Sequence, residues 1–112
     1  MTIVTMHEID EAKLAEVMAE ASKIGSVTLN VYNDGNGTYH TLEGVHRTEA
    51  AKRLGLPLIL VEREWDELVE CDLQDIEIED GKASVQAIVE YAYSSYTGGI
   101  YSENDFESVE MK

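Results

Sequence analysis

Apolar residues recur with a helical period near the start of the chain. From Leu14 to Ile24 they return every three or four positions, which places them on one face of a helix. Asp10 is a suitable N-cap for this helix, and Gly25 can end it in a left-handed conformation. We therefore predict a helix from Asp10 to Ile24. Its predicted buried face consists of Leu14, Val17, Met18, Ala21 and Ile24.

A period of two follows, which is typical of a half-buried strand. From Ser26 to Tyr32 the chain alternates between apolar and polar residues. The segment from Asn33 to Gly37 predicts a hairpin turn, because Asn and Gly accept positive φ. Thr38 to Glu43 is then the expected return strand. Ile3 to Met6 is predicted to form a further short strand near the N-terminus.

The middle of the chain predicts a glycine, a short helix and a strand. The helix is expected to begin at Gly44 and to end at Gly55, and Pro57 cannot continue it. Its apolar face consists of Ala50, Ala51 and Leu54. Leu58 to Val61 is an apolar run of the length expected for a buried strand.

Shorter patterns follow in the second half. We expect a short helix from Trp65 to Leu73 and a short strand from Asp75 to Glu79. Ten of the 19 residues from Glu62 to Asp80 are acidic, which indicates a solvated flank. The stretch from Lys82 to Tyr96 fits both a helix and a strand, and the glycines that follow it favour the helix.

The C-terminal region contains four tyrosines with two alternative roles. They can stack on a bound base, or they can pack in the core and at its rim, which is the commoner role. These residues are Tyr91, Tyr93, Tyr96 and Tyr101. From Ser102 onward the sequence is acidic and polar, and we expect this tail to be disordered.

Composition indicates one globular domain. The chain has 112 residues, 44% of them hydrophobic, which is enough for one core. It contains neither an apolar run long enough to span a membrane nor a secretory signal at its N-terminus. Its one cysteine, Cys71, excludes an internal disulfide and fits a reducing compartment. These features together lead us to expect a cytoplasmic protein.

The net charge of −15 restricts the range of partners. A surface with 23 acidic residues repels a phosphate backbone, so direct binding of nucleic acid is not expected. A small nucleotide remains compatible, because salt screens distant acids beyond roughly 8–10 Å. Four of the eight basic residues fall within 17 positions: Arg47, Lys52, Arg53 and Arg63. Glu49 can pair with Arg53 four residues on, so Lys52 and Arg53 are expected on a solvated helix face.

The predicted helix start at Gly44 is the main candidate for chemistry. A helix start presents unpaired backbone N–H groups and the positive end of the helix dipole, which attract anions. Arg47 can add a two-pronged donor for phosphate. His46 can add a donor that titrates near neutral pH.

The pattern from His7 to Val61 resembles the ParB/sulfiredoxin superfamily. Members share a helix ending in glycine, a hairpin, a G-x-H-R or G-x-R-R box, and an alanine-rich helix followed by LG. Here the box is Gly44-Val45-His46-Arg47, and the helix ends in Leu54-Gly55. The resemblance implies a single compact α+β domain over residues 1–112, with helices packed on a small mixed sheet. Residues 3–63 would form its core, and residues 64–112 a divergent acidic half.

In that superfamily the box binds nucleotide phosphates. The resemblance therefore implies a nucleotide-binding domain that hydrolyses a nucleotide such as ATP, ADP or CTP, or transfers its phosphoryl group. The implied phosphate-binding residues are Gly44, Val45, His46, Arg47 and Thr48. His46 and Arg47 are the candidate catalytic residues, together with Glu8 as a general base. Glu8 and Glu43 would hold a Mg²⁺ ion on the phosphates, and no structural metal is expected.

Branches of the superfamily differ in chemistry. Sulfiredoxins carry a cysteine where this chain has Val45, so their activity is not expected. Chromosome-partition ParB proteins add DNA-binding and dimerisation domains, for which this chain is too short and too acidic. Free-serine kinases carry a His-Glu pair ahead of the first helix, which His7-Glu8 resembles. The alternative interpretation of His7 and Glu8 is that both are exposed residues at a helix start.

A non-enzymatic role is the second interpretation. An acidic surface can engage a basic protein partner, and by imitating nucleic acid it can inhibit a DNA-binding protein. A small acidic chain of this kind suits an accessory protein of a phage, a plasmid or another mobile element. Neither interpretation involves a membrane.

Overall fold

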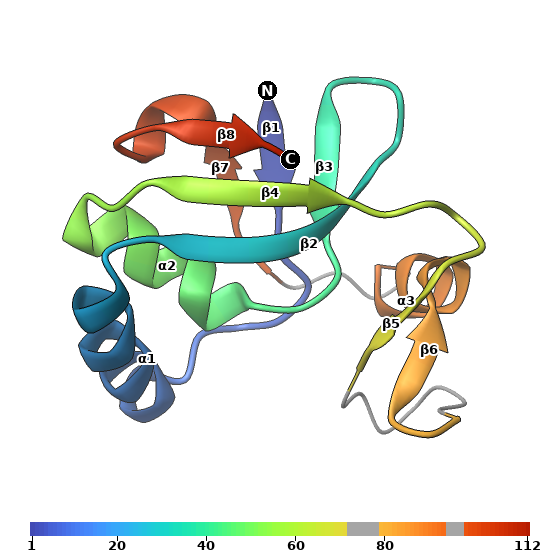
Figure 1. The fold of residues 1–112 in the computed structure, drawn as a ribbon, viewed down its shortest axis with the longest axis horizontal. Helices are drawn as coiled ribbons and strands as arrows, with labels where there is room; N and C mark the ends of the chain where they lie inside the picture. Colours follow the sequence, from blue (N-terminus) through green and yellow to red (C-terminus); the bar gives the residue numbers. More distant parts are fainter. Residues whose placement is uncertain (72–78, 94–97) are drawn as a thin grey trace.

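A mixed sheet of six strands forms the centre of the protein (Figure 1). The computed structural model describes residues 1–71, 79–93 and 98–112. The strands lie in the order β7-β1-β3-β2-β4-β8. Their bounds are β1 Thr2–Val4, β2 Val27–Asn33, β3 Thr38–Thr41, β4 Leu58–Glu62, β7 Ile100–Ser102 and β8 Val109–Met111. The pairs β1–β3, β2–β4 and β4–β8 are parallel, and the pairs β2–β3 and β1–β7 are antiparallel. The predicted α+β class with a small mixed sheet is confirmed.

Helix α1 (Glu11–Ile24) has the ends that the sequence predicts. The Asp10 carboxylate accepts hydrogen bonds from the backbone N–H groups of Ala12 at 2.9 Å and Lys13 at 3.3 Å. Gly25 ends the helix at φ 85°. The prediction that Ile24 belongs to the buried face is wrong, because its side chain is 68% exposed. It lies in the last turn, where its side chain reaches the edge of a surface hollow and not the core.

The hairpin of β2 and β3 also forms as predicted. Val31 pairs with Thr41 and Asn33 with Tyr39 in an antiparallel register. In the turn, the Asn33 side chain accepts a hydrogen bond from the N–H of Gly35 at 2.9 Å. Gly35 has a φ of 85°, a conformation that glycine adopts without the steric cost of a Cβ. The alternate residues Val27, Leu29 and Val31 are all buried.

Helix α2 (Val45–Leu54) and strand β4 follow Gly44 as predicted. The main hydrophobic cluster joins both helices to the alternate buried residues of β2 and β4. It includes Leu14 and Ala21 of α1, Ala50 and Ala51 of α2, and Leu29, Leu58 and Leu60 of the sheet. Figure 1 shows α1 and α2 side by side next to β2. The start of α2 is therefore held between α1 and the sheet.

The acidic half departs from the prediction. Within the expected helix from Trp65 to Leu73, strand β5 (Leu68–Glu70) forms, and residues 72–73 lie outside the described residues. Strand β5 pairs antiparallel with β6 (Lys82–Ser84). This pairing satisfies the backbone of a segment that is too short to be stable as a helix by itself. Of the strand expected from Asp75 to Glu79, only Glu79 is described; it forms an isolated bridge with Lys82.

The stretch from Lys82 to Tyr96, which fits both a helix and a strand in the sequence, forms helix α3 (Val85–Ala92) over most of its described length. The favoured helix is right from Val85 onward, where the Ser84 hydroxyl accepts a hydrogen bond from the N–H of Ala87 at 3.1 Å. Residues 82–84 are the strand β6, and residues 94–97 lie outside the described residues. Together β5, β6 and α3 cover a second hydrophobic cluster that contains Met6, Leu42, Val69, Cys71, Ala83, Val85 and Ile88.

The expected disorder of the tail from Ser102 is wrong. A 3₁₀ helix, η1 (Glu103–Asp105), follows Ser102, and β8 pairs with β4 at the edge of the main sheet. Phe106 is only 7% exposed and packs on Tyr101, with ring centroids 5.8 Å apart. One buried aromatic ring and one strand pairing thus anchor a segment whose other residues are mostly polar and exposed.

Candidate functional site

The start of α2 has a backbone shape suited to an anion. Gly44 occupies the N-cap position at φ 103°, ψ 37°, and no side chain of the described residues caps the helix. A left-handed residue followed by helical residues turns successive N–H groups toward one point, which forms an anion-binding concavity. The position requires glycine, because a Cβ at residue 44 would lie 2.6 Å from Cδ2 of Leu29.

A hollow of about 600 Å³ opens beside this helix start. Helix α1, the first residues of β2, and the segment from Leu42 to Arg47 form its walls. Buried apolar residues form its floor: Met6, Ala21, Val27, Leu42, Val45 and Cys71. The charged and polar residues that line it are all half-buried or exposed and form its rim: His7, Lys13, Glu20, Ser26, Thr28, Glu43, His46 and Arg47.

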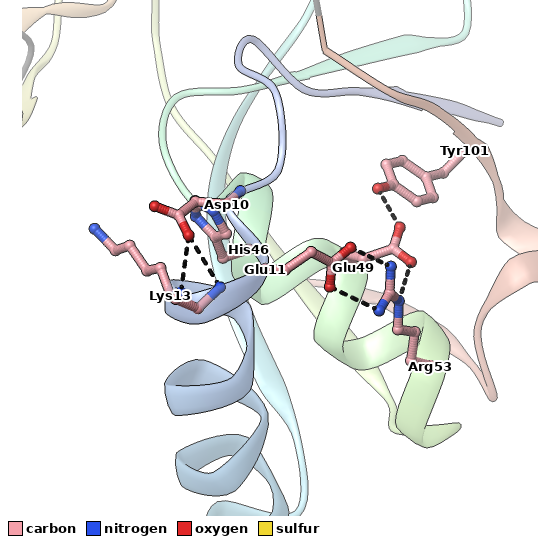
Figure 2. A network of polar contacts seen from close by, with 8 residues as sticks. Asp10, Glu11, Lys13, His46, Glu49, Arg53 and Tyr101 are labelled. Atoms are coloured by element: carbon pink, nitrogen blue, oxygen red, sulfur yellow. Dashed lines mark hydrogen bonds and ion pairs between the residues drawn. The ribbon is translucent and has the colours of Figure 1, made fainter.

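His46 connects the starts of the two helices (Figure 2). Its Nε2 accepts a hydrogen bond from the backbone N–H of Asp10 at 2.9 Å. A ring nitrogen that accepts must be unprotonated, so His46 is neutral in this arrangement. Partial burial lowers the pKa of His46 below its ordinary value, and the nearby Lys13 lowers it further. His46 therefore acts here as an acceptor that positions α1, in contrast to the predicted donor.

The Arg47 side chain is hydrogen-bonded to the start of β2. Its Nη1 donates to the backbone carbonyl of Thr28 at 3.0 Å, and the side chain remains exposed. Within residues 1–71, 79–93 and 98–112, no carboxylate forms an ion pair with Arg47. Its charge is thus held at the rim by a neutral partner and is available to an anion.

Arg53 and Lys52, two of the four basic residues that cluster in the sequence, make contacts within the protein. Arg53 donates to Glu49 at 2.7 Å and to Glu11 at 3.4 Å (Figure 2). Tyr101 donates to the same Glu49 at 2.7 Å. Burial raises the pKa of Glu49, but the hydrogen bonds from Arg53 and Tyr101 outweigh it and leave the pKa below its usual range. Lys52 lies over the Tyr101 ring, 5.6 Å from its centroid, and neither Lys52 nor Arg53 is among the residues that line the hollow.

Two predicted phosphate-binding residues face away from the rim. Thr48 is fully buried, and both its N–H and its hydroxyl donate to the carbonyl of Gly44, at 2.9 and 2.8 Å. This hydroxyl tightens the first turn of α2 and is not directed into the hollow. Val45 contributes its side chain to the floor.

The two predicted metal-binding carboxylates are not equivalent. Glu43 is exposed and lines the hollow, whereas Glu8 is exposed and is not among the residues that line it. In the described part of the chain, no group of three or more His, Cys, Asp or Glu side chains is placed to hold a metal ion. Of the two predicted carboxylates, only Glu43 lines the hollow in the described part of the chain.

Sequence reasoning missed Lys13 and assigned the tyrosines no single role. Lys13 lies in the first turn of α1 and reaches the rim only because the two helix starts meet there. Tyr93 donates to the carbonyls of Thr41 at 2.7 Å and Val4 at 3.0 Å, so it is part of the framework, as is Tyr101. Tyr91 is 52% exposed, and Tyr96 lies outside the described residues.

Comparison of the chain with protein-family models, with curated proteins and with solved structures found no match. A search of the described residues for a helix long and apolar enough to cross a membrane also found none. The site must therefore be interpreted from its own residues.

Proposed function

We propose that this protein binds a small phosphate-bearing ligand at the rim of the hollow, with nucleotides as the class to test first because of the ParB/sulfiredoxin resemblance. The observation that carries the proposal is the position of Arg47. Its guanidinium is exposed next to the uncapped start of α2 and is bonded only to the carbonyl of Thr28 among its described hydrogen-bond and ion-pair contacts. A guanidinium and helix N–H groups at one point are complementary to phosphate oxygens.

Local charge supports the same proposal. Among the described side chains at the rim, Lys13 and Arg47 are positively charged and Glu20 and Glu43 are negatively charged, so these four charges balance. The protein as a whole carries a net charge of −15, so this rim is far less acidic than the average surface. At physiological salt the more distant carboxylates are screened over about 8 Å. An anion next to Arg47 would therefore be repelled much less than over the rest of the surface.

Phosphoryl transfer is a further step of this proposal. Arg47 would neutralise charge that develops on the transferred group. Glu8 could approach a ligand only from outside the hollow, so Glu43 is the better placed carboxylate for a metal ion or a hydroxyl nucleophile. Binding is the part of the proposal that the geometry supports best, and it can be tested separately from turnover.

The test compares two arginine variants. Arg47→Ala removes the rim guanidinium, and Arg53→Ala removes an exposed guanidinium that is paired on the far part of α2. Isothermal titration with ATP, CTP and inorganic phosphate, with and without Mg²⁺, should show affinity about 10- to 100-fold weaker for Arg47→Ala, the range expected for a lost charged hydrogen bond. Arg53→Ala should bind as the parent does.

Far-ultraviolet circular dichroism would confirm that both variants fold. The proposal fails if the parent binds none of these anions. It also fails if folded Arg47→Ala binds them with unchanged affinity.

A further inference from the structure

We infer that the ligand is a phosphate ester with an apolar body, an aryl or alkyl monophosphate, whose phosphate lies at the rim and whose body lies on the floor of the hollow. This inference rests on the proposed phosphate site and deepens it by naming the substrate class. It follows from the way burial separates the two kinds of residue that line the hollow.

The floor offers apolar surface. Its six buried residues are aliphatic side chains, one methionine and one cysteine. The side chains that form strong hydrogen bonds, such as His7, Lys13 and Glu43, are all on the more exposed rim. Sugar hydroxyl groups placed on this floor would lose hydrogen bonds to water without gaining side-chain partners. An aromatic ring or an alkyl chain would gain from leaving water.

The floor is also wide. Ala21 and Val27 belong to the main hydrophobic cluster, whereas Met6, Leu42 and Cys71 belong to the cluster under α3. The hollow thus lies where the two clusters meet, and about 600 Å³ is within the range of sites that bury small organic ligands. A body the size of one or two fused rings would contact both clusters.

Charge fixes the orientation of such a ligand. Arg47 belongs to α2, Lys13 belongs to the start of α1, and both lie at the rim. A phosphate bound at these groups leaves the rest of the ligand to extend either along the hollow or into water, and the apolar floor favours an apolar body in the hollow. The apolar body then covers the floor next to Val45, the first residue of α2.

The experiment holds the phosphate constant and varies the body. Titrations of the full chain with inorganic phosphate, ribose 5-phosphate, phenyl phosphate and 1-naphthyl phosphate should place 1-naphthyl phosphate at least about tenfold tighter than ribose 5-phosphate. Roughly 60 Å² of buried apolar surface is enough for that ratio. Val17→Asn, on the wall of the hollow, should weaken 1-naphthyl phosphate severalfold and leave inorganic phosphate unchanged. Ile100→Asn, at an exposed apolar residue on β7 outside the hollow, is the matched control and should change neither.

A second readout does not depend on any variant. Cys71 lies on the floor, so a body that covers it should slow its alkylation by iodoacetamide, whereas inorganic phosphate should not. If ribose 5-phosphate binds as tightly as 1-naphthyl phosphate and Arg47→Ala weakens both, the inference is overturned and the proposed function stands. If no phosphate compound binds, or 1-naphthyl phosphate binds Arg47→Ala unchanged, the proposed phosphate site itself is overturned.

Discussion

At the scale of single residues, His46 has the most informative position. It was predicted as a donor to phosphate, yet its Nε2 accepts the N–H of Asp10, the N-cap residue of α1. One imidazole thereby ties the first turn of α2 to the first turn of α1. Protonation of Nε2 would remove the acceptor, so the contact between the two helix starts depends on pH.

A pH dependence of stability follows from His46. Its pKa in the folded protein lies below the ordinary 6.5, first because of burial and then because of Lys13. The unfolded chain therefore binds the proton more readily, and the stabilisation present above pH 6.5 is lost as pH falls toward the folded pKa. Urea denaturation at pH 7.5, 6.5 and 5.5 should show a fall in the free energy of unfolding that is larger in the parent than in His46→Gln.

Glutamine is the appropriate control because its side-chain oxygen can accept the same hydrogen bond without titrating. All other ionisable groups are the same in the two proteins, so their contributions largely cancel in the comparison. Parallel pH profiles for the two proteins would contradict this account of His46.

At the scale of elements, the start of α2 is determined by its contact with β2. Gly44 has positive φ, and a Cβ at this position would lie 2.6 Å from Cδ2 of Leu29 in β2, so one of the two would have to shift. The Thr48 hydroxyl then closes the first turn on the carbonyl of Gly44. These contacts set the direction of the helix start and thereby place Arg47 at the rim of the hollow.

Replacing Gly44 should destabilise the protein more than positive φ alone explains. For Gly44→Ala we expect a loss of about 2–4 kcal/mol, from the left-handed conformation together with overpacking against Leu29. Gly35→Ala is the matched control, because Gly35 has a φ of 85° but open space around its α-carbon. Its expected cost is about 1 kcal/mol. Equal losses of unfolding free energy for the two variants in urea denaturation would show that the clash with Leu29 does not contribute to the cost of Gly44→Ala.

At the scale of the whole molecule, charge opposes compactness. A net charge of −15 on 112 residues repels itself in the folded state, and salt screens that repulsion. In the described part of the acidic half, Glu67 pairs with Arg63 at 2.9 Å and Glu103 pairs with the N-terminal amino group at 3.4 Å, and its other described carboxylates form no ion pair. We therefore expect stability to depend on ionic strength.

Raising NaCl from about 20 to 300 mM should increase the free energy of unfolding by on the order of 1 kcal/mol, which is about 4–8 °C in Tm for a domain of this size. A triple variant, Glu16→Gln, Glu64→Gln and Glu107→Gln, removes three exposed charges and should gain less from the same salt. Differential scanning calorimetry would measure both. A Tm that is constant or falls with salt would count against charge repulsion as a destabilising force.

The sequence by itself determined the features that depend on neighbouring residues. The N-cap at Asp10, the glycine stops, the hairpin turn and the ends of α2 were all predictable, because a cap or a turn is formed within a few residues of chain. The ion pair between Glu49 and Arg53 was predictable for the same reason, since the two residues are one helical turn apart on α2.

Only the tertiary structure decided which of these pieces meet. The hydrogen bond between Asp10 and His46 spans 36 residues, and β8 pairs with β4 about 50 positions earlier in the chain. Short segments such as β5 and β8 become strands because a partner strand is available. Each is too short to show the alternation by which a strand can be predicted from the sequence. The rim and floor of the hollow likewise arise from the packing of α1 against α2 and the sheet, because no local pattern brings Lys13 and Arg47 to the same hollow.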